Sequence, residues 1–137
     1  ALAARADGKE AIIVPLILKG EKITDMKRAL KELLPWLQLE GLMKNSISQL
    51  SYVELKLAQF ARAIIGRPRI LLLDNFFFFF LENMEKKINY LILALNKIGT
   101  SIIIFGPPPK GNTIKFNKKY KISESGLIEI ERNPLSL

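Results

Sequence analysis

The chain has 137 residues, of which 49% are hydrophobic and 25% charged, which is typical of one globular domain with a substantial core. It contains neither cysteine nor histidine. These absences exclude a disulfide framework, thiolate or imidazole metal sites and every catalytic triad that needs histidine. The sequence therefore predicts no bound metal ion.

The formal net charge is +8, and part of this excess lies in a lysine-rich segment over residues 110–121. Clustered lysines attract polyanions, so the segment is a candidate patch for nucleic acid or anionic lipid. An ordinary solvated strand, with Phe116 and Tyr120 facing inward, explains the same pattern. The candidate residues are Lys110, Lys115, Lys118, Lys119 and Lys121.

Two apolar stretches, residues 71–81 and 88–105, raise the question of a membrane span. The first is too short and the second is interrupted by polar residues, whereas a spanning helix needs about 20 nearly continuous apolar residues. The first ten residues also lack the basic and then apolar pattern of a signal peptide. We expect a chain without a transmembrane segment of its own.

The first half of the chain is predicted to be helical. Ala11–Leu18 is a short apolar run, and Thr24–Leu37 has apolar residues at a period near 3.6, which predicts an amphipathic helix. Thr24 is the expected cap of this helix. A second helix starts at the capping box formed by Ser51 and Glu54, and we expect Gly66 and Pro68 to end it.

The second half alternates strands and a helix. Ile70–Leu73 is a continuous apolar run, as expected of a strand buried on both faces of a parallel sheet. An amphipathic helix over Asn83–Asn96 and a strand over Ser101–Phe105 complete a right-handed βαβ unit. Lys115–Ile122 and Leu127–Glu131 then flank a turn and predict a β-hairpin.

Five consecutive phenylalanines, Phe76, Phe77, Phe78, Phe79 and Phe80, follow the first strand. Alternation along an extended strand would turn the first, third and fifth rings one way and the other two the opposite way. One strand cannot bury both sets in a single core. We therefore predict that the run contributes to an interface with a partner protein.

The order and spacing of these motifs resemble the signature helix and Walker B strand of ABC-type ATPases, whose pattern is approximately LSGGQ, then ARA, then a proline and LLLDE. Here residues 50–54 read LSYVE, residues 61–63 read ARA, and Pro68 precedes ILLLD at residues 70–74. Residues 15–17, Gly20 and the helix Thr24–Leu37 resemble the helical subdomain of the same family. The segment Val-Pro-Leu is most similar to ATPases of the lipoprotein-export and cell-division type, and the haem-exporter ATPase of cytochrome c maturation is a weaker match.

The resemblance implies an α/β fold, namely a truncated P-loop NTPase-like (ABC ATPase) domain. Residues 1–50 would form a segment like the helical subdomain. Residues 51–137 would form the carboxyl-terminal α/β half, with a parallel βαβ unit followed by a β-hairpin. Both segments would belong to one structural unit.

The resemblance assigns a vestigial nucleotide site to Ser51, Glu54, Asp74 and Asn75. Asp74 stands where the Walker B aspartate holds Mg²⁺ through water, and Asn75 replaces the catalytic glutamate. An amide cannot accept a proton at neutral pH, so the general base is lost. We therefore expect no catalytic residue here.

Other parts of the family's site differ as well. Tyr52 and Val53 replace the two signature glycines, and Pro107 stands near the place of the switch histidine. No G-x-x-x-x-G-K-[ST] segment, the loop whose N–H groups cradle phosphate, occurs in the 137 residues. The resemblance thus implies no cofactor, with ATP and Mg²⁺ present only if another chain completes the site.

Three functions remain open. In the first, the chain is a catalytically degenerate ABC-transporter ATPase-like subunit that works through protein contacts. In the second, it is an ABC-derived structural subunit of a respiratory complex or ribosome. In the third, it is a fragment of a split ABC ATPase completed by a separate P-loop-bearing chain. The resemblance implies a membrane permease or a P-loop-bearing ATPase chain as partner, and an intracellular location peripheral to a membrane complex. The Ile-, Lys-, Asn- and Phe-rich second half also indicates an AT-rich genome, such as that of an organelle (mitochondrion).

Overall fold

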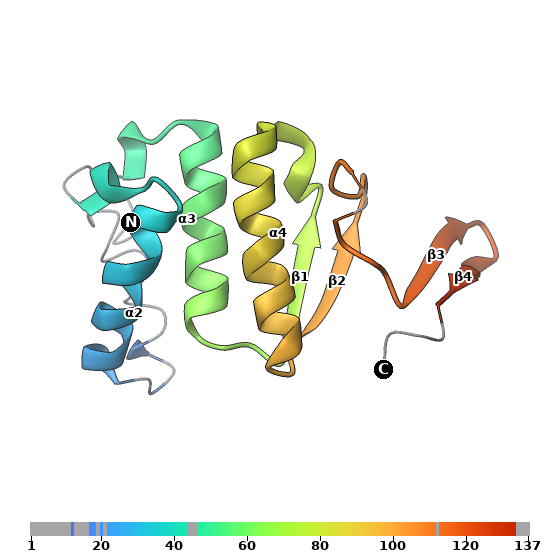
Figure 1. Cartoon of the computed structure of the whole chain (residues 1–137), viewed down its shortest axis with the longest axis horizontal. Helices are drawn as coiled ribbons and strands as arrows, with labels where there is room; N and C mark the ends of the chain where they lie inside the picture. The colour runs from blue at the N-terminus through green and yellow to red at the C-terminus, as the bar shows by residue number, and fades with distance from the viewer. Residues whose placement is uncertain are drawn as a thin grey trace.

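The computed structural model of the protein describes residues 12, 17–18, 20, 22–43, 47–111 and 113–133. In this part of the chain, helices α2, α3 and α4 lie side by side, a small parallel sheet packs next to α4, and a hairpin projects beyond the sheet (Figure 1). Most of the predicted apolar run Ala11–Leu18 lies outside the described residues. Short 3₁₀ helices cover Glu40–Met43, Ile47–Gln49 and Phe76–Phe79.

Helix α2 spans Ile23–Trp36, close to the predicted range. Its N-cap is Lys22, without a side-chain cap hydrogen bond, so the expectation that Thr24 caps the helix is wrong. The helix begins at Ile23, so Thr24 already lies inside its first turn and is not the cap. Pro35 lies in the last turn; it has no N–H to bond the carbonyl oxygen four residues earlier, and the helix ends at the next residue.

Helix α3 spans Tyr52–Ile65 and begins at the predicted capping box. Its C-cap Gly66 has φ of −72°, so the left-handed freedom of glycine is not used there. The reversal occurs at Arg67, which has φ of 45°. Pro68 disfavours the right-handed helical region at the residue before it, and this explains why the chain leaves the helix at Arg67.

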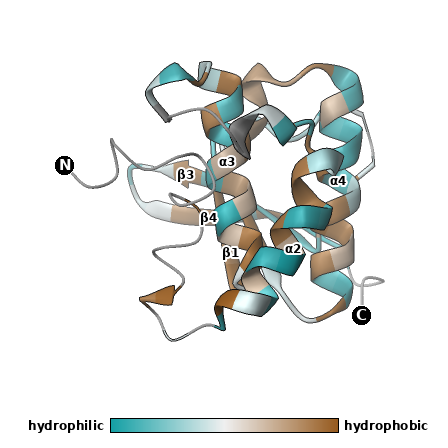
Figure 2. Ribbon diagram, turned by 90° about the vertical axis from the view of Figure 1, so that its left-hand side faces the viewer, coloured by the Kyte–Doolittle hydropathy of each residue, from teal (hydrophilic) through white to brown (hydrophobic). Residues whose placement is uncertain are grey.

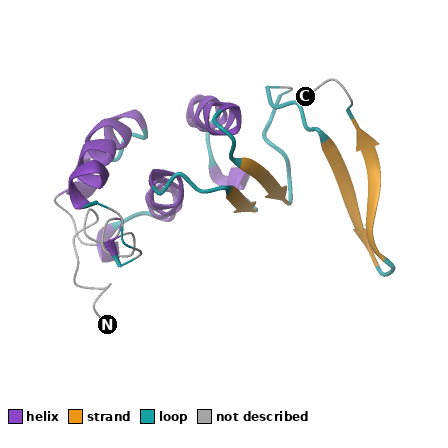
Figure 3. Ribbon diagram, turned by 90° about the horizontal axis from the view of Figure 1, so that it is seen from below, coloured by secondary structure: helices purple, strands orange, loops and turns teal. Residues whose placement is uncertain are grey.

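Strands β1 (Ile70–Asp74) and β2 (Ser101–Phe105) pair in parallel, from Ile70 opposite Ser101 to Asp74 opposite Phe105. Helix α4 (Glu82–Lys97) connects them and lies on one face of the sheet (Figure 3). The predicted βαβ unit is thus present. Together with the neighbouring helices, it confirms the predicted α/β class.

The predicted burial of the first strand on both faces is wrong. Leu71 and Leu73 are buried, but Ile70 is 59% exposed and Leu72 is 61% exposed. The physical reason is that, among the described residues, the helices lie on one side of the sheet only (Figure 3). The alternate side chains therefore face outward with no helix against them.

The hydrophobic core joins the three helices to the inner face of β1. Each helix contributes the residues that its 3.6-residue period places on one side. The buried side chains include Leu30 and Leu34 of α2, Phe60, Ala61 and Ile64 of α3, Ile88 and Ile92 of α4, and Leu71 and Leu73 of β1.

The phenylalanine run forms a 3₁₀ helix rather than a strand, so the expected strand alternation is wrong. Phe76, Phe77 and Phe80 are buried, whereas Phe78 is 67% and Phe79 46% exposed. A 3₁₀ helix turns every three residues, which places Phe77 and Phe80 on the same inner side. The Phe76 ring centroid lies 4.9 Å from that of Phe80, so much of the run belongs to the core.

Strands β3 (Lys118–Ser123) and β4 (Gly126–Arg132) form the predicted antiparallel hairpin, which starts three residues later than expected. Nearly all of its side chains are exposed, including the hydrophobic residues Leu127, Ile128 and Ile130 of β4. Figure 2 shows brown, hydrophobic stretches along the ribbon of the hairpin. Tyr120 is also exposed, so an inward aromatic face is not formed there.

Across the described residues, no helix combines the length and the apolar character that a membrane crossing requires.

The division of the phenylalanine run can be tested by paired substitutions. We expect Phe76→Ala to lower the free energy of unfolding by about 3–5 kcal/mol, because it opens a cavity beside Phe60 and Phe80. Phe78→Ala should change it by less than about 0.5 kcal/mol, since that ring is exposed. Urea denaturation measures both values, and equal losses in the two variants would contradict the observed packing.

Candidate functional site

The candidate site lies at the carboxyl ends of β1 and β2, where open α/β sheets place their ligands. Asp74 is the last residue of β1 and its side chain is exposed. Asn75 follows in the left-handed conformation, with φ of 47°. The Asn75 backbone N–H donates to the carbonyl oxygen of Phe105 over 3.0 Å, so the end of β2 holds the residue after Asp74 in place.

The Asn75 side chain is committed to local contacts. Its Nδ2 donates to Oδ1 of Asp74 over 3.2 Å. Gly106, the residue after β2, has φ of 86°, and a Cβ built there would lie 2.3 Å from Oδ1 of Asn75. Both the conformation and the close approach require glycine. Sequence reasoning missed this role of Gly106, although a glycine directly after a strand was the available signal.

Ser51 and Glu54 form the predicted capping box at the start of α3. The Glu54 N–H donates to Ser51 Oγ over 3.3 Å, and the Ser51 N–H donates to Glu54 Oε2 over 2.8 Å. The Ser51 hydroxyl also donates to Oε2 over 2.7 Å, and these hydrogen bonds lower the pKa of Glu54 below its ordinary value. A phosphate at this helix start would compete with the Glu54 carboxylate for the Ser51 N–H.

An exposed aromatic patch connects the start of α3 with the phenylalanine run. We define the patch as Tyr52, Phe78, Phe79 and Leu81, all of which are exposed. The Tyr52 and Phe79 ring centroids lie 4.7 Å apart in an edge-to-face arrangement, and those of Phe78 and Phe79 lie 4.8 Å apart. Tyr52, which stands in the place of a signature glycine, thus contacts Phe79 in the run that follows the Walker B position.

The five candidate lysines do not form one compact cluster. Lys110 lies in the loop after β2, and its charge acts on Glu82 at the start of α4. In the hairpin, Lys119 Nζ forms an ion pair with Glu131 over 2.6 Å. Lys115, Lys118 and Lys121 are exposed, and a role for these lysines in binding a polyanion stays a prediction.

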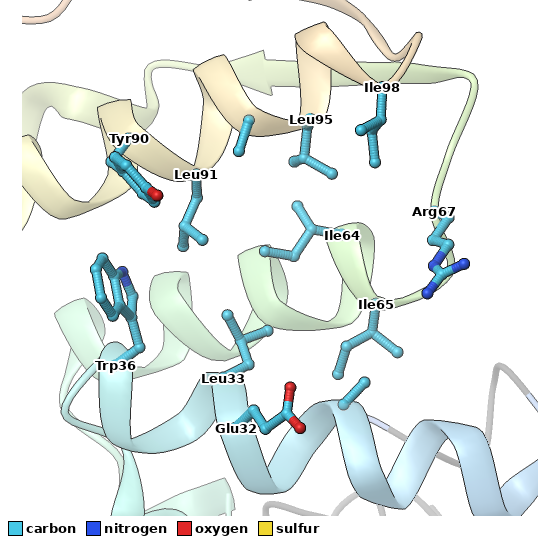
Figure 4. Close-up of a pocket in the computed structure, with 12 residues that line it drawn as sticks. Glu32, Leu33, Trp36, Ile64, Ile65, Arg67, Tyr90, Leu91, Leu95 and Ile98 are labelled. Atoms are coloured by element: carbon cyan, nitrogen blue, oxygen red, sulfur yellow. The ribbon is translucent and has the colours of Figure 1, made fainter.

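A separate apolar groove of about 450 Å³ lies between α2 and α4, with the end of α3 as its floor (Figure 4). The rings of Trp36 and Tyr90 lie at one end with their centroids 5.6 Å apart, and Glu32 and Arg67 also line it. The groove is at the end of α3, whereas the start of α3 contacts the phenylalanine run that follows Asp74. The groove is therefore not part of the site around Asp74.

Comparison with known proteins shows what this arrangement is similar to. No protein-family model matches the chain. Over 99 residues, its sequence is 32% identical to the lipoprotein-releasing system ATP-binding protein LolD of Colwellia psychrerythraea. The matched segment covers 72% of this chain and 38% of that relative. This chain is related to the ABC ATP-binding proteins. The resemblance predicted from the motifs is thus confirmed.

The fold agrees with this relationship. The structure matches the ADP conformation of MJ1267, an ATP-binding cassette of an ABC transporter, with a TM-score of 0.58 and 22% sequence identity. The match covers 82% of this chain and 44% of the cassette. The chain therefore spans less than half the length of each of these two proteins, and it shares the cassette fold over that part.

The contact between Asn75 and Gly106 can be tested with a matched pair of glycine substitutions. Gly99 also has positive φ, of 104°, but nothing lies within 4 Å of a Cβ built there. We expect Gly99→Ala to cost about 1 kcal/mol for its conformation alone. Gly106→Ala should cost about 1–3 kcal/mol more, because Asn75 must also move. Equal losses of unfolding free energy would contradict the close approach.

The capping box predicts a specific dependence of stability on pH. We expect Ser51→Ala to destabilise the protein by about 1 kcal/mol at neutral pH. The stabilisation that comes from the charged Glu54 carboxylate is fully present above the ordinary carboxyl pKa of about 4.3. It is lost as the pH falls through the lowered pKa of Glu54 in the folded protein. The difference between wild type and variant should therefore shrink in acid.

Denaturation at several pH values measures this difference. Thr24→Ala is the matched control, since α2 has no side-chain cap hydrogen bond, and it should change stability little at any pH. A difference for Ser51→Ala that stays constant from neutral pH to about pH 3, well below the ordinary carboxyl pKa, would show that Glu54 does not contribute.

Proposed function

We propose that this chain is a non-catalytic component of an ABC-type ATP-binding unit in a membrane transport complex, and that it acts through contacts with partner proteins. The relationship to an ATP-binding protein of a lipoprotein-releasing system supports the kind of complex. The cassette fold supports the kind of unit. The proposal places the chain inside the cell and peripheral to the membrane complex; an organellar location stays a prediction from composition.

The observation that carries the non-catalytic assignment is the environment of Asn75. Hydrolysis of ATP needs a group that orients or deprotonates the attacking water next to the transferred phosphoryl group. Here the residue after Asp74 is an amide, which cannot accept a proton. Its Nδ2 is bonded to Asp74, and its Oδ1 lies against Gly106. The side chain therefore stabilises the two loops instead of presenting a base.

The aromatic patch supports the partner contact. Exposed apolar patches on soluble proteins mark interaction sites, and aromatic residues are enriched among interface anchors. The Phe79 ring packs against both Tyr52 and Phe78, so less side-chain entropy remains to be lost on binding. Of the five predicted interface residues, Phe78 and Phe79 are the two that a partner can reach without unfolding the core.

Calorimetry with ATP and Mg²⁺ tests the nucleotide part of this proposal. We expect the isolated chain to show no binding at micromolar concentrations and no turnover, because it holds no phosphate-binding loop and no base at Asn75. Asp74→Asn should leave both results unchanged. Micromolar affinity that Asp74→Ala abolishes would overturn the non-catalytic assignment.

Affinity purification of the tagged chain from its native cells tests the partner part. We expect Phe78→Ser with Phe79→Ser to reduce recovery of the partner complex at least tenfold, since two anchors of about 2 kcal/mol each are lost. Tyr90→Ser is the matched control, because Tyr90 is exposed on α4 away from the patch. Recovery of a ribosome or respiratory complex in place of a transporter would favour the alternative structural role.

A further inference from the structure

The apolar groove between α2 and α4 is a second site, which the proposed function does not use. Its volume of about 450 Å³ lies within the range of about 300–1,000 Å³ that is typical of ligand pockets. Apolar side chains of all three helices line it, among them Leu33, Ile64, Leu91 and Leu95 (Figure 4). Ligand pockets are mostly apolar, with a few polar groups that orient the ligand. The groove therefore has the size and the lining of a site for a small molecule with an apolar part.

One end of the groove is closed by a bridge between α2 and α4. The Trp36 and Tyr90 ring centroids lie 5.6 Å apart at this end (Figure 4). Lys87 Nζ also donates to the Trp36 carbonyl oxygen over 3.3 Å, which links the same two helices. An α-helix with its side chains is about 10 Å wide, so a helix laid along the groove would meet this bridge. A flexible alkyl chain can end against the rings instead.

The opposite end of the groove opens into a polar hollow of about 510 Å³. Glu32 and Arg67 line both the groove and the hollow. The hollow lies between the start of α2 and the end of α3, and Asp25 and Arg28 line it as well. Among the described residues, no ion pair joins any of these four side chains. Two carboxylates and two guanidinium groups thus line the hollow without being paired with one another.

These charges indicate what kind of head group the ligand carries. Arginine presents a planar fork of N–H donors that binds phosphate through paired hydrogen bonds, and an ammonium group donates to carboxylates. A head with negative charge alone would lie next to Asp25 and Glu32, and a head with positive charge alone would lie next to Arg28 and Arg67. Like charges repel one another. A head group that carries both charges is therefore the one that the hollow complements.

We propose that the groove and the hollow together bind a single-chain phospholipid with a zwitterionic head. The acyl chain lies in the groove and ends against the ring of Trp36. The phosphate is bound by Arg67 and Arg28, and the ammonium group by Asp25 and Glu32. This inference goes beyond the proposed function, because neither the site around Asp74 nor the aromatic patch takes part in it.

The fluorescence of the chain tests this inference, because Trp36 is its one tryptophan. Lysophosphatidylethanolamine is added to the full chain below the concentration at which the lipid forms micelles. We expect the emission of Trp36 to move to shorter wavelength in a saturable way, because the acyl chain displaces water from the ring. An alkyl maltoside and a fatty acid with the same chain length should bind about tenfold more weakly or worse, since the arginine–phosphate hydrogen bonds are lost. Phosphoethanolamine, the head group alone, should produce no shift.

Each of the other results overturns the inference. Equal affinity for the maltoside and the phospholipid would mean that the groove takes any detergent. Equal affinity for the fatty acid would mean that the carboxylates of the hollow do not select the head group. A shift with phosphoethanolamine alone would mean that the groove takes no part in binding, and the absence of a saturable shift would mean that no lipid binds.

Matched variants assign the two parts of the site. Arg67→Asn removes the charge, and asparagine tolerates the left-handed φ of 45° at this position. It should weaken phospholipid binding about tenfold and leave maltoside binding unchanged, whereas Arg62→Gln, at an exposed position of α3 outside the groove, should change neither. Ala94→Phe fills the groove and should abolish the shift, whereas Ala63→Phe, also exposed and outside the groove, should not. Circular dichroism checks that each variant is folded, and equal effects within either pair overturn the inference.

A photochemical cross-link identifies the occupant in native membranes. Ile98→Cys places the chain's one thiol in the groove, at the end where Arg67 lies (Figure 4). The thiol is coupled to a benzophenone maleimide, the protein is mixed with membranes from its native cells and illuminated, and the products are measured by mass spectrometry. An adduct with a zwitterionic phospholipid supports the inference. An adduct with a polypeptide alone overturns it, because a protein segment then occupies the groove, and so does the absence of a phospholipid adduct.

Discussion

The parallel pairing of β1 with β2 is the constraint on which the rest of this structure depends. It aligns Asp74 with Phe105 and allows the Asn75 N–H to bond the Phe105 carbonyl oxygen. That bond brings the loops after the two strands together, and the left-handed conformations of Asn75 and Gly106 follow from their close approach. The same pairing positions α4 over one face, so it also decides which strand residues enter the core.

The phenylalanine run connects this pairing to the helices. Three of its rings enter the core, where Phe76 packs against Phe60 of α3 at a centroid distance of 5.0 Å. The other two rings remain outside, and Phe79 contacts Tyr52 at the start of α3. The exposed rings therefore lie next to the start of α3 and just after the carboxyl end of β1. The proposed function assigns this apolar surface to a contact with a partner protein.

Sequence patterns predicted much of this fold because the information is local. The 3.6-residue period placed α2, α3 and α4 within a few residues of their observed bounds, and the capping box at Ser51 and Glu54 was read from two side chains three residues apart. The predictions that failed depended on tertiary context. The burial of β1, for example, depends on what covers its outer face, and no local pattern specifies that.

The position of Asp74 and Asn75 at the end of β1 was predictable from the sequence, but their local geometry was not. The motif spacing located Asp74 and Asn75, but no pattern indicated that the Asn75 side chain lies against Gly106. The phenylalanine run has no periodicity, since all five residues are identical, and so the sequence could not distinguish a strand from a 3₁₀ helix. The partition of its rings between core and surface follows from the left-handed turn at Asn75 that precedes it.

Residue-resolved amide exchange tests the central claim of an open sheet most directly. Because pairing in a parallel ladder alternates, the amides of Leu71 and Leu73 share the side of Asn75 and point toward β2, whereas those of Leu72 and Asp74 point to the free edge. In the isolated chain, we expect slow exchange at Leu71 and Leu73 and fast exchange at Leu72 and Asp74. Slow exchange at all four amides in the isolated chain would contradict the account, because it would mean that the edge of β1 is already covered.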